Sequence, residues 1–141
     1  MATTTVNVSR EIAAPLDRVW DVVSDVDNEP RYWHGTKSVR NISREGNVIT
    51  REVVIAFKDS RTMQTVTLNP KSSVETRITE GPITGSRTVT LHPADGGKKT
   101  RVDVVWDFKL GGLLSVFSGM VKKHITEGTE QALERIAKAV E

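Results

Sequence analysis

Three histidines, His34, His92 and His124, are the only imidazoles in this chain of 141 residues. No two of them have the i, i+4 spacing with which a helix presents a pair of metal ligands. The chain also contains no cysteine. Disulfides, thiolate catalysis and cysteine-ligated metals are therefore excluded, and no metal or other cofactor is expected.

His124 is the histidine with the most apolar surroundings. Its neighbours along the expected helix face are Phe117, Met120 and Gly128. We expect such a ring to be desolvated, which depresses its pKa and leaves a neutral donor and acceptor near neutral pH. The simpler alternative is a core histidine whose ring is satisfied by a backbone carbonyl or a strand residue.

His124 lies within a long helix that the sequence predicts from Leu113 to Val140, without an internal proline. Its roughly 28 residues would extend about 42 Å, whereas a strand of ten residues covers about 33 Å. Such a helix must cross its sheet diagonally or overhang it. The apolar stripe rotates along the helix, as packing against a twisted sheet requires.

The elements before this helix read mainly as strands. Alternation over Val6–Ile12 predicts a first strand, and five turn signals between Ser38 and Phe108 predict six more in an antiparallel meander. Two short helices are expected after the first strand, one beginning near Pro15 and one near Pro30. The predicted fold class is α+β: a curved seven-stranded antiparallel sheet wrapped round a long C-terminal helix, forming a single domain over residues 1–141.

Strand parity also places polar side chains on the inward face of the sheet. They are Arg51, Gln64, Thr76 and Arg87. The favoured interpretation is that they lie at strand ends or sheet rims, where long charged side chains reach water. The alternative is that some of them line a partly solvated pocket.

Composition limits the partners of the chain. Lys and Arg number 20 against 18 Asp and Glu, and a net charge of +2 gives no broad field for nucleic acid. Residues 1–5 lack the basic and apolar regions of a secretory signal, so a cytoplasmic protein is expected. The apolar run Leu110–Val121 is too short for an integral membrane segment. Within it, Gly112–Met120 carries more apolar surface than one helix face buries, and the excess is available to ligand, membrane surface or a second subunit of a homodimer.

This order of elements resembles the helix-grip fold of the START and polyketide cyclase superfamily, in its coenzyme Q-binding-protein-like or cyclase-like branch. The most specific local resemblance is Ile12–Pro15 followed by Val19–Asp25 and Pro30–Trp33. It implies that Pro15 starts the first helix, that Val19 and Trp20 pack that helix under the sheet, and that Tyr32 and Trp33 close one end of a cavity. Superfamily members include lipid carriers, hormone receptors, cyclases and ribosome-associated proteins, so the fold leaves the activity open.

The inward apolar residues predict a pocket between the sheet and the last helix that binds an apolar small molecule such as a lipid, quinone or polyketide, as a carrier or sensor. Its expected lining is Trp33, Phe57, Trp106, Phe117, Met120 and His124. One alternative is a polyketide cyclase or dehydratase, with His124, Arg51 and Arg87 as the candidate catalytic groups. A second alternative is a protein-interaction module of the ribosome-associated type, which would need no internal cavity.

Overall fold

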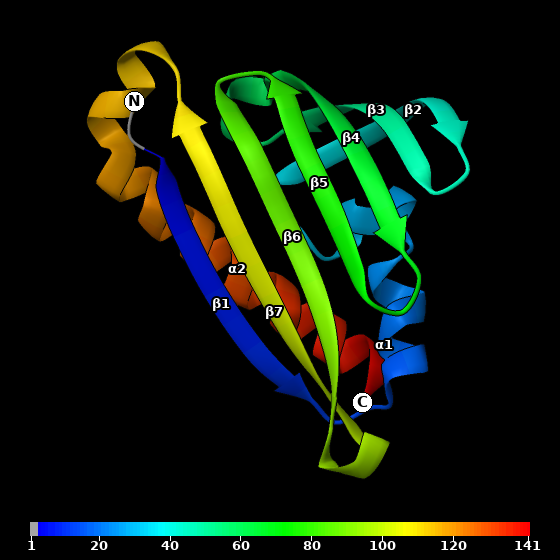
Figure 1. Cartoon of the computed structure of the whole chain (residues 1–141). Helices are drawn as coiled ribbons and strands as arrows, with labels where there is room; N and C mark the ends of the chain where they lie inside the picture. The colour runs from blue at the N-terminus through cyan, green and yellow to red at the C-terminus, as the bar shows by residue number, and fades with distance from the viewer. Residues whose placement is uncertain (1–2) are drawn as a thin grey trace.

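A computed structural model describes residues 3–141, so Met1 and Ala2 of the segment considered for a signal lie outside it. It contains a curved, seven-stranded antiparallel sheet with the strand order β1-β7-β6-β5-β4-β3-β2 (Figure 1). The strands are β1 (Thr4–Ile12), β2 (Thr36–Glu45), β3 (Val48–Ile55), β4 (Arg61–Asn69), β5 (Ser73–Glu80), β6 (Ile83–Ala94) and β7 (Lys99–Leu110). The predicted meander is confirmed: β2 to β7 pair in sequence, and β1 closes the order against β7.

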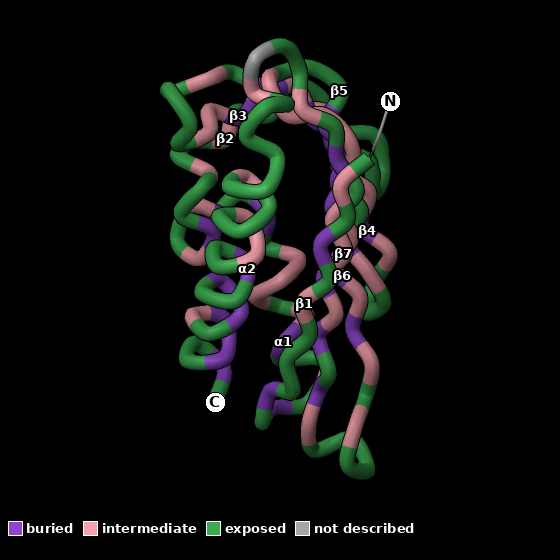
Figure 2. The backbone as a smooth tube through the Cα atoms, turned by 90° about the vertical axis from the view of Figure 1, so that its left-hand side faces the viewer, coloured by how far each residue is buried: buried purple, intermediate pink, exposed green. Residues whose placement is uncertain are grey.

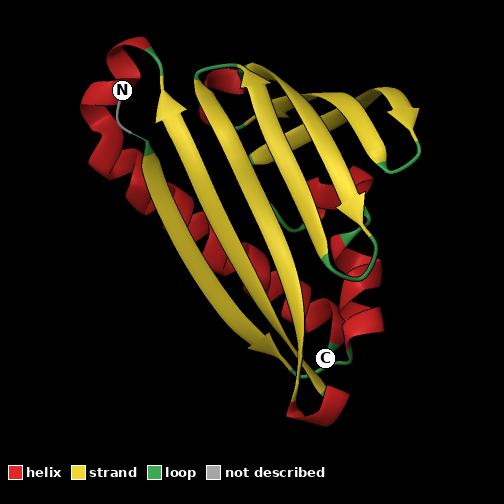
Figure 3. Ribbon diagram, in the orientation of Figure 1, coloured by secondary structure: helices red, strands yellow, loops and turns green. Residues whose placement is uncertain are grey.

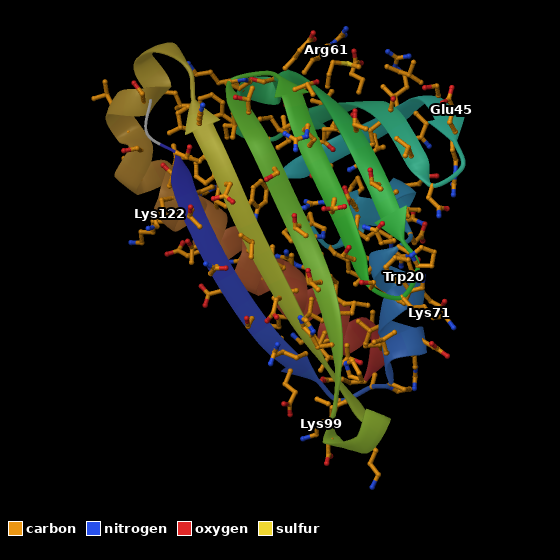
Figure 4. The ribbon with its side chains drawn as sticks, in the orientation of Figure 1. Trp20, Glu45, Arg61, Lys71, Lys99 and Lys122 are labelled. Atoms are coloured by element: carbon orange, nitrogen blue, oxygen red, sulfur yellow. The ribbon has the colours of Figure 1, made fainter. Side chains whose placement is uncertain are left out.

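The α-helices lie on one face of this sheet, and short 3-10 turns also occur at strand ends (Figure 3). The helices are α1 (Leu16–Val23), the 3-10 helix η1 (Val26–Arg31) and the long α2 (Ser118–Val140), with short 3-10 turns η2 (Phe57–Asp59), η3 (Asp95–Gly97) and η4 (Gly112–Phe117). Pro15 is the N-cap of α1, and Val19 is fully buried under the sheet. Trp20, labelled on α1 in Figure 4, is half-buried and packs against the same core. The predicted helix-grip fold is thereby confirmed.

The predicted start of the long helix at Leu113 is wrong. The backbone forms the 3-10 helix η4 over Gly112–Phe117, and the α-helix begins only at Ser118. Neither η4 nor α2 has a side-chain hydrogen bond that caps its N-terminus. Gly112 adopts a φ of 56°, which turns the backbone away from the direction of β7. Without a capping side chain the first amide groups lack partners, and a 3-10 turn is a common way to satisfy part of them.

Burial divides α2 into two halves. Its buried residues all lie in the second half, and they are Thr129, Ala132, Leu133, Ile136, Ala137 and Val140. The residues from Ser118 to Gly128 are half-buried or exposed, a change of colour that can be followed along α2 in Figure 2. The core therefore lies between the sheet, α1 and the C-terminal half of α2. The space opposite the middle of α2 is left for a cavity.

Strand parity predicts the inward face correctly. In β7, Val102, Val104 and Phe108 are buried, while Trp106 on the same face is half-buried. Charged side chains such as Glu45, Arg61, Lys71, Lys99 and Lys122 lie at the periphery of the ribbon (Figure 4). None of the described helices is long and apolar enough to span a membrane.

Candidate functional site

A cavity of about 420 Å³ lies between the sheet and α2. Its walls come from the turn after η1, the end of β3 with η2, the inward faces of β4 to β7, and α2 from His124 to Arg135. The apolar part of the lining includes Trp33, Phe57, Ile78 and Trp106. This volume falls within the range of about 300–1,000 Å³ typical of small-molecule pockets.

Four of the six predicted ligand-binding residues line this cavity, namely Trp33, Phe57, Trp106 and His124. Phe117 and Met120 do not, and their exposed fractions are 51% and 70%. The cavity wall on α2 begins at His124, one helical turn after Met120. The prediction that Phe117 and Met120 line the cavity therefore does not hold, because this end of the helix extends beyond the wall. Of the expected pair at one end of the cavity, Trp33 is part of the lining and Tyr32 is not.

His124 lines the cavity, but its side chain is exposed. The expected desolvation is wrong, and so is the alternative of a satisfied core histidine. Both rested on an apolar helix face that packs into the core, whereas the core in fact begins at Thr129. His124 thus faces the cavity from a solvated part of its wall.

The four inward polar residues are all buried, which contradicts the favoured interpretation that they reach water at rims. Exposed fractions are 0% for Arg51, 7% for Gln64, 3% for Thr76 and 5% for Arg87. Gln64, Thr76 and Arg87 line the cavity, and Arg51 lies behind them, outside the lining. Two buried guanidinium groups need a counter-charge nearby, because an unpaired buried charge is costly.

Glu29 of η1 supplies that charge and is itself only 5% exposed. Its Oε1 accepts a hydrogen bond from Nη2 of Arg51 at 2.5 Å, and its Oε2 accepts one from Nη2 of Arg87 at 2.6 Å. Arg51 also donates to the Val26 carbonyl at 3.0 Å and twice to Oε1 of Gln64, at 2.9 and 3.0 Å. This network fixes η1 against β3, β4 and β6.

Sequence reasoning missed Glu29, although a signal was present. Arg51 and Arg87 share the inward face, so an acidic residue had to lie in a segment that covers that face. The segment between α1 and β2 is the one that carries acidic residues close to a proline–aromatic turn. Glu29 is its single buried acid.

Arg87 packs against two tryptophans. The centre of its guanidinium lies 4.3 Å from the ring centroid of Trp33 and 5.5 Å from that of Trp106, distances suited to cation–π attraction. Burial lowers the pKa of Arg87 from its ordinary value; the Glu29 carboxylate opposes this effect, and the nearby charge of Arg51 adds to it. Arg87 therefore presents a confined cation to an otherwise largely apolar space.

Trp106 also connects the cavity to α2. Its indole Nε1 donates to the Thr129 hydroxyl at 3.0 Å, and that hydroxyl donates to the Ile125 carbonyl one turn earlier at 2.7 Å. Thr129 is 1% exposed, so this chain of bonds is shielded from water. The described residues contain no group of three or more His, Cys, Asp or Glu side chains placed to hold a metal ion.

The fold is a helix-grip fold with a cavity between the sheet and α2. The chain belongs to the family described as "Polyketide cyclase / dehydrase and lipid transport", which it matches over residues 3–141. A Streptomyces halstedii protein that carries the provisional name polyketide cyclase is 30% identical over 98 residues, covering 70% of this chain and 81% of that protein.

Two solved structures show the same fold. The Zhui aromatase/cyclase of Streptomyces sp. R1128 has a TM-score of 0.86 at 17% identity, covering 98% of this chain and 93% of that one. A START superfamily protein from Mycobacterium smegmatis has a TM-score of 0.78 at 19% identity and covers 96% of both chains. At these identities the likeness concerns the fold and leaves the activity open.

Proposed function

We propose that the protein binds an apolar, ring-bearing small molecule in the cavity between the sheet and α2, as a carrier or sensor. The observation that carries the proposal is the cavity of about 420 Å³, whose walls combine Trp33, Phe57 and Trp106 with a few buried polar groups. Aromatic walls favour flat ring systems, because stacked and edge-on contacts add to area burial. The family's description, which names polyketides and lipids, agrees with such a ligand.

Two glycines of α2 provide a matched test of this site. Gly128 lines the cavity, and a Cβ built on it meets no atom within 4 Å. Gly119 also has open space at its Cβ, but it lies outside the lining and on a different side of the helix. Gly128→Phe should fill the cavity with a ring, while Gly119→Phe adds the same ring elsewhere.

The measurement is the affinity of a naphthalene derivative by isothermal titration calorimetry. Gly128→Phe should weaken binding at least tenfold, and Gly119→Phe should leave it within about twofold of the parent chain, with both variants folded by circular dichroism. Equal affinity in the two variants would contradict binding at this cavity. A loss of affinity in both variants would indicate that the ligand binds elsewhere on α2.

A second candidate is a cyclase or dehydratase that acts on a polyketide. It is favoured by the presence in one cavity lining of both Arg87, on the sheet side, and His124, on α2, since such a reaction needs polar groups beside a confined chain. An aldol closure joins an enolate carbon to a carbonyl carbon, moves a proton to the new alkoxide, and then loses water. In this candidate reaction Arg87 would stabilise the oxygen that becomes negative, and His124 would move the proton.

Incubation with a linear poly-β-ketone thioester, followed by mass spectrometry, tests this candidate. A cyclised product lighter by one water, formed by the parent chain and absent with His124→Ala at unchanged binding, would support the enzyme. Equal product formation by His124→Ala and the parent chain would show that His124 takes no part in the reaction. The cavity gives no support to the interaction-module alternative, which would need none.

A further inference from the structure

Thr76 and Arg87 form a pair of unsatisfied donors on the cavity wall. They are direct register partners on β5 and β6, so their side chains are neighbours on the same face of the sheet. Both line the cavity, and both are at least nine-tenths buried. Within the described chain, the hydroxyl oxygen of Thr76 and Nε of Arg87 have no hydrogen-bond partner. Buried polar atoms nearly always have one, so this pair points to a missing group.

The local charges indicate what kind of group is missing. The buried network holds two guanidinium groups, of Arg51 and Arg87, and one carboxylate, of Glu29, whose two oxygens are both engaged. Arg51 directs its donors at Val26, Gln64 and Glu29 and does not line the cavity. The excess positive charge therefore meets the cavity at Arg87.

The other charged or titratable groups of the lining are the exposed His34, in the turn after η1, and three residues of α2, and they leave this excess uncancelled. Arg135 donates to the Tyr32 carbonyl at 3.0 Å, and Glu127 and His124 are exposed. Water screens exposed charges strongly, so Glu127 offsets little of the field at a site that is buried. Arg87 remains the buried cation of the cavity wall.

The two tryptophans also restrict how a ligand can reach Arg87. The guanidinium carbon of Arg87 lies 4.3 Å from the ring centroid of Trp33 and 5.5 Å from that of Trp106, so the two indoles occupy space next to the group, whose N–H donors point outward in its own plane. A hydrogen-bond acceptor must approach the N–H edge, where Nε is unpaired and Thr76 is the cross-strand neighbour. An oxygen with free lone pairs fits this approach, and a cationic or purely apolar group does not.

We propose that the ligand carries a negatively charged oxygen group, of the carboxylate type, that accepts hydrogen bonds from Nε of Arg87 and the hydroxyl of Thr76. The apolar rings of the ligand then lie toward Phe57 and Ile78. This inference rests on the proposed function and adds the chemical class of the ligand to it. The charge of the ligand completes the network of Glu29, Arg51 and Arg87, which the protein alone leaves one negative charge short.

Two probes of nearly equal shape test this class, namely 2-naphthoate and 2-naphthamide, titrated by calorimetry into the full chain. Hydrogen bonds to charged groups favour the acid about 10- to 100-fold in the parent chain. Thr76→Val should reduce that preference severalfold, and Arg87→Met should abolish it. The amide's affinity should fall less than that of the acid in either variant, because its oxygen carries no charge and its ring contacts are retained.

Stability measurements separate a lost contact from a damaged fold. Thr76→Val removes a hydroxyl that has no partner, so its urea midpoint should equal or exceed that of the parent chain. Thr100→Val is the matched control, because the buried hydroxyl of Thr100 donates to the Ala14 carbonyl at 2.9 Å and lies outside the cavity. Thr100→Val should lower the urea midpoint and leave the preference for 2-naphthoate over 2-naphthamide unchanged.

The possible outcomes distinguish this inference from the proposed function. Equal binding of both probes to the parent chain would overturn the anionic ligand and leave the cavity as an apolar binding site. A preference that survives in both Thr76→Val and Arg87→Met would show that the acid is recognised elsewhere. If neither probe binds the parent chain, the proposed function fails, and the inference fails with it.

Discussion

Glu29→Gln is the substitution that most directly tests how the buried network holds this fold together. The change keeps the size and shape of the side chain and removes its charge. Arg51 and Arg87 then lie beside a neutral amide, and each guanidinium loses its buried counter-charge. The side chains concerned are 7%, 0% and 6% exposed, so water cannot replace the lost carboxylate.

The expected loss follows from the contacts that are broken. Two charge-assisted hydrogen bonds of about 1.5–3 kcal/mol each are weakened or lost, and removal of one partner from a buried ion pair costs about 3–5 kcal/mol. One amide oxygen can still accept a bond. We therefore expect the free energy of unfolding to fall by about 3–4 kcal/mol, and the melting temperature by on the order of 10 °C.

Urea denaturation followed by circular dichroism measures this loss. Glu134→Gln is the control, because Glu134 forms an exposed i, i+4 pair with Lys138 at 3.1 Å and should change the midpoint little. The double variant Glu29→Gln with Arg87→Met should be more stable than Glu29→Gln alone, since one of the two unpaired cations is removed. A loss below about 1 kcal/mol for Glu29→Gln, against the expected range for a broken buried pair, would refute the network as a structural element.

Two further predictions concern other parts of the sheet. Gly85→Ala should disrupt the β6–β7 pairing and lower the urea midpoint severely, because its Cβ would lie 2.1 Å from the Asp107 carbonyl oxygen and Gly85 has a φ of 140°; a midpoint near that of the parent chain would contradict the register. Partial burial raises the pKa of Asp103, but the Ser9 hydroxyl and the charges of Arg101 and His92 outweigh it, so the pKa of Asp103 is held below its ordinary value. The resulting stabilisation is present above the pKa of an unfolded aspartate, about 3.9, and is lost as the pH falls through the lower folded value. Asp103→Asn should thus cost about 0.5–1 kcal/mol near neutral pH and match the parent chain in strong acid, as urea denaturation across pH would show.

The inward set of polar residues shows where local sequence information ends. Side chains alternate between the two faces of a strand with a period of two residues. This is a local property, so the sequence alone predicts the correct face for Arg51 and Arg87. Their burial depends on Glu29, which lies 22 and 58 residues away along the chain. Parity cannot decide whether an inward arginine meets water or a carboxylate, because that depends on the segment packed over it. The rule that buried charges are paired supplies the missing step.

The error at Phe117 and Met120 has a different origin. Helical periodicity gives the direction of a side chain around the axis, and that direction was shared with His124 and Gly128. It gives no information on position along the axis relative to the strands. The 3-10 turn η4 also replaces the first part of the predicted helix, and neither its uncapped start nor the limit of the cavity at His124 is encoded in the periodicity.

The unequal burial of α2 separates stability from binding along a single helix. Leu133, Ile136 and Val140 pack into the core, so truncating one of them leaves a cavity in the fold at a cost of about 1–5 kcal/mol. Gly128 and Ile125 face open space in the preceding turns, where side chains contribute less to the core. Thr129 connects the cavity to the core. Its buried hydroxyl accepts a hydrogen bond from the Trp106 indole and so fixes the β7 side of the cavity to the helix. The buried residues of α2 after Thr129 are therefore held by the core, whereas the residues that line the cavity can change with the ligand.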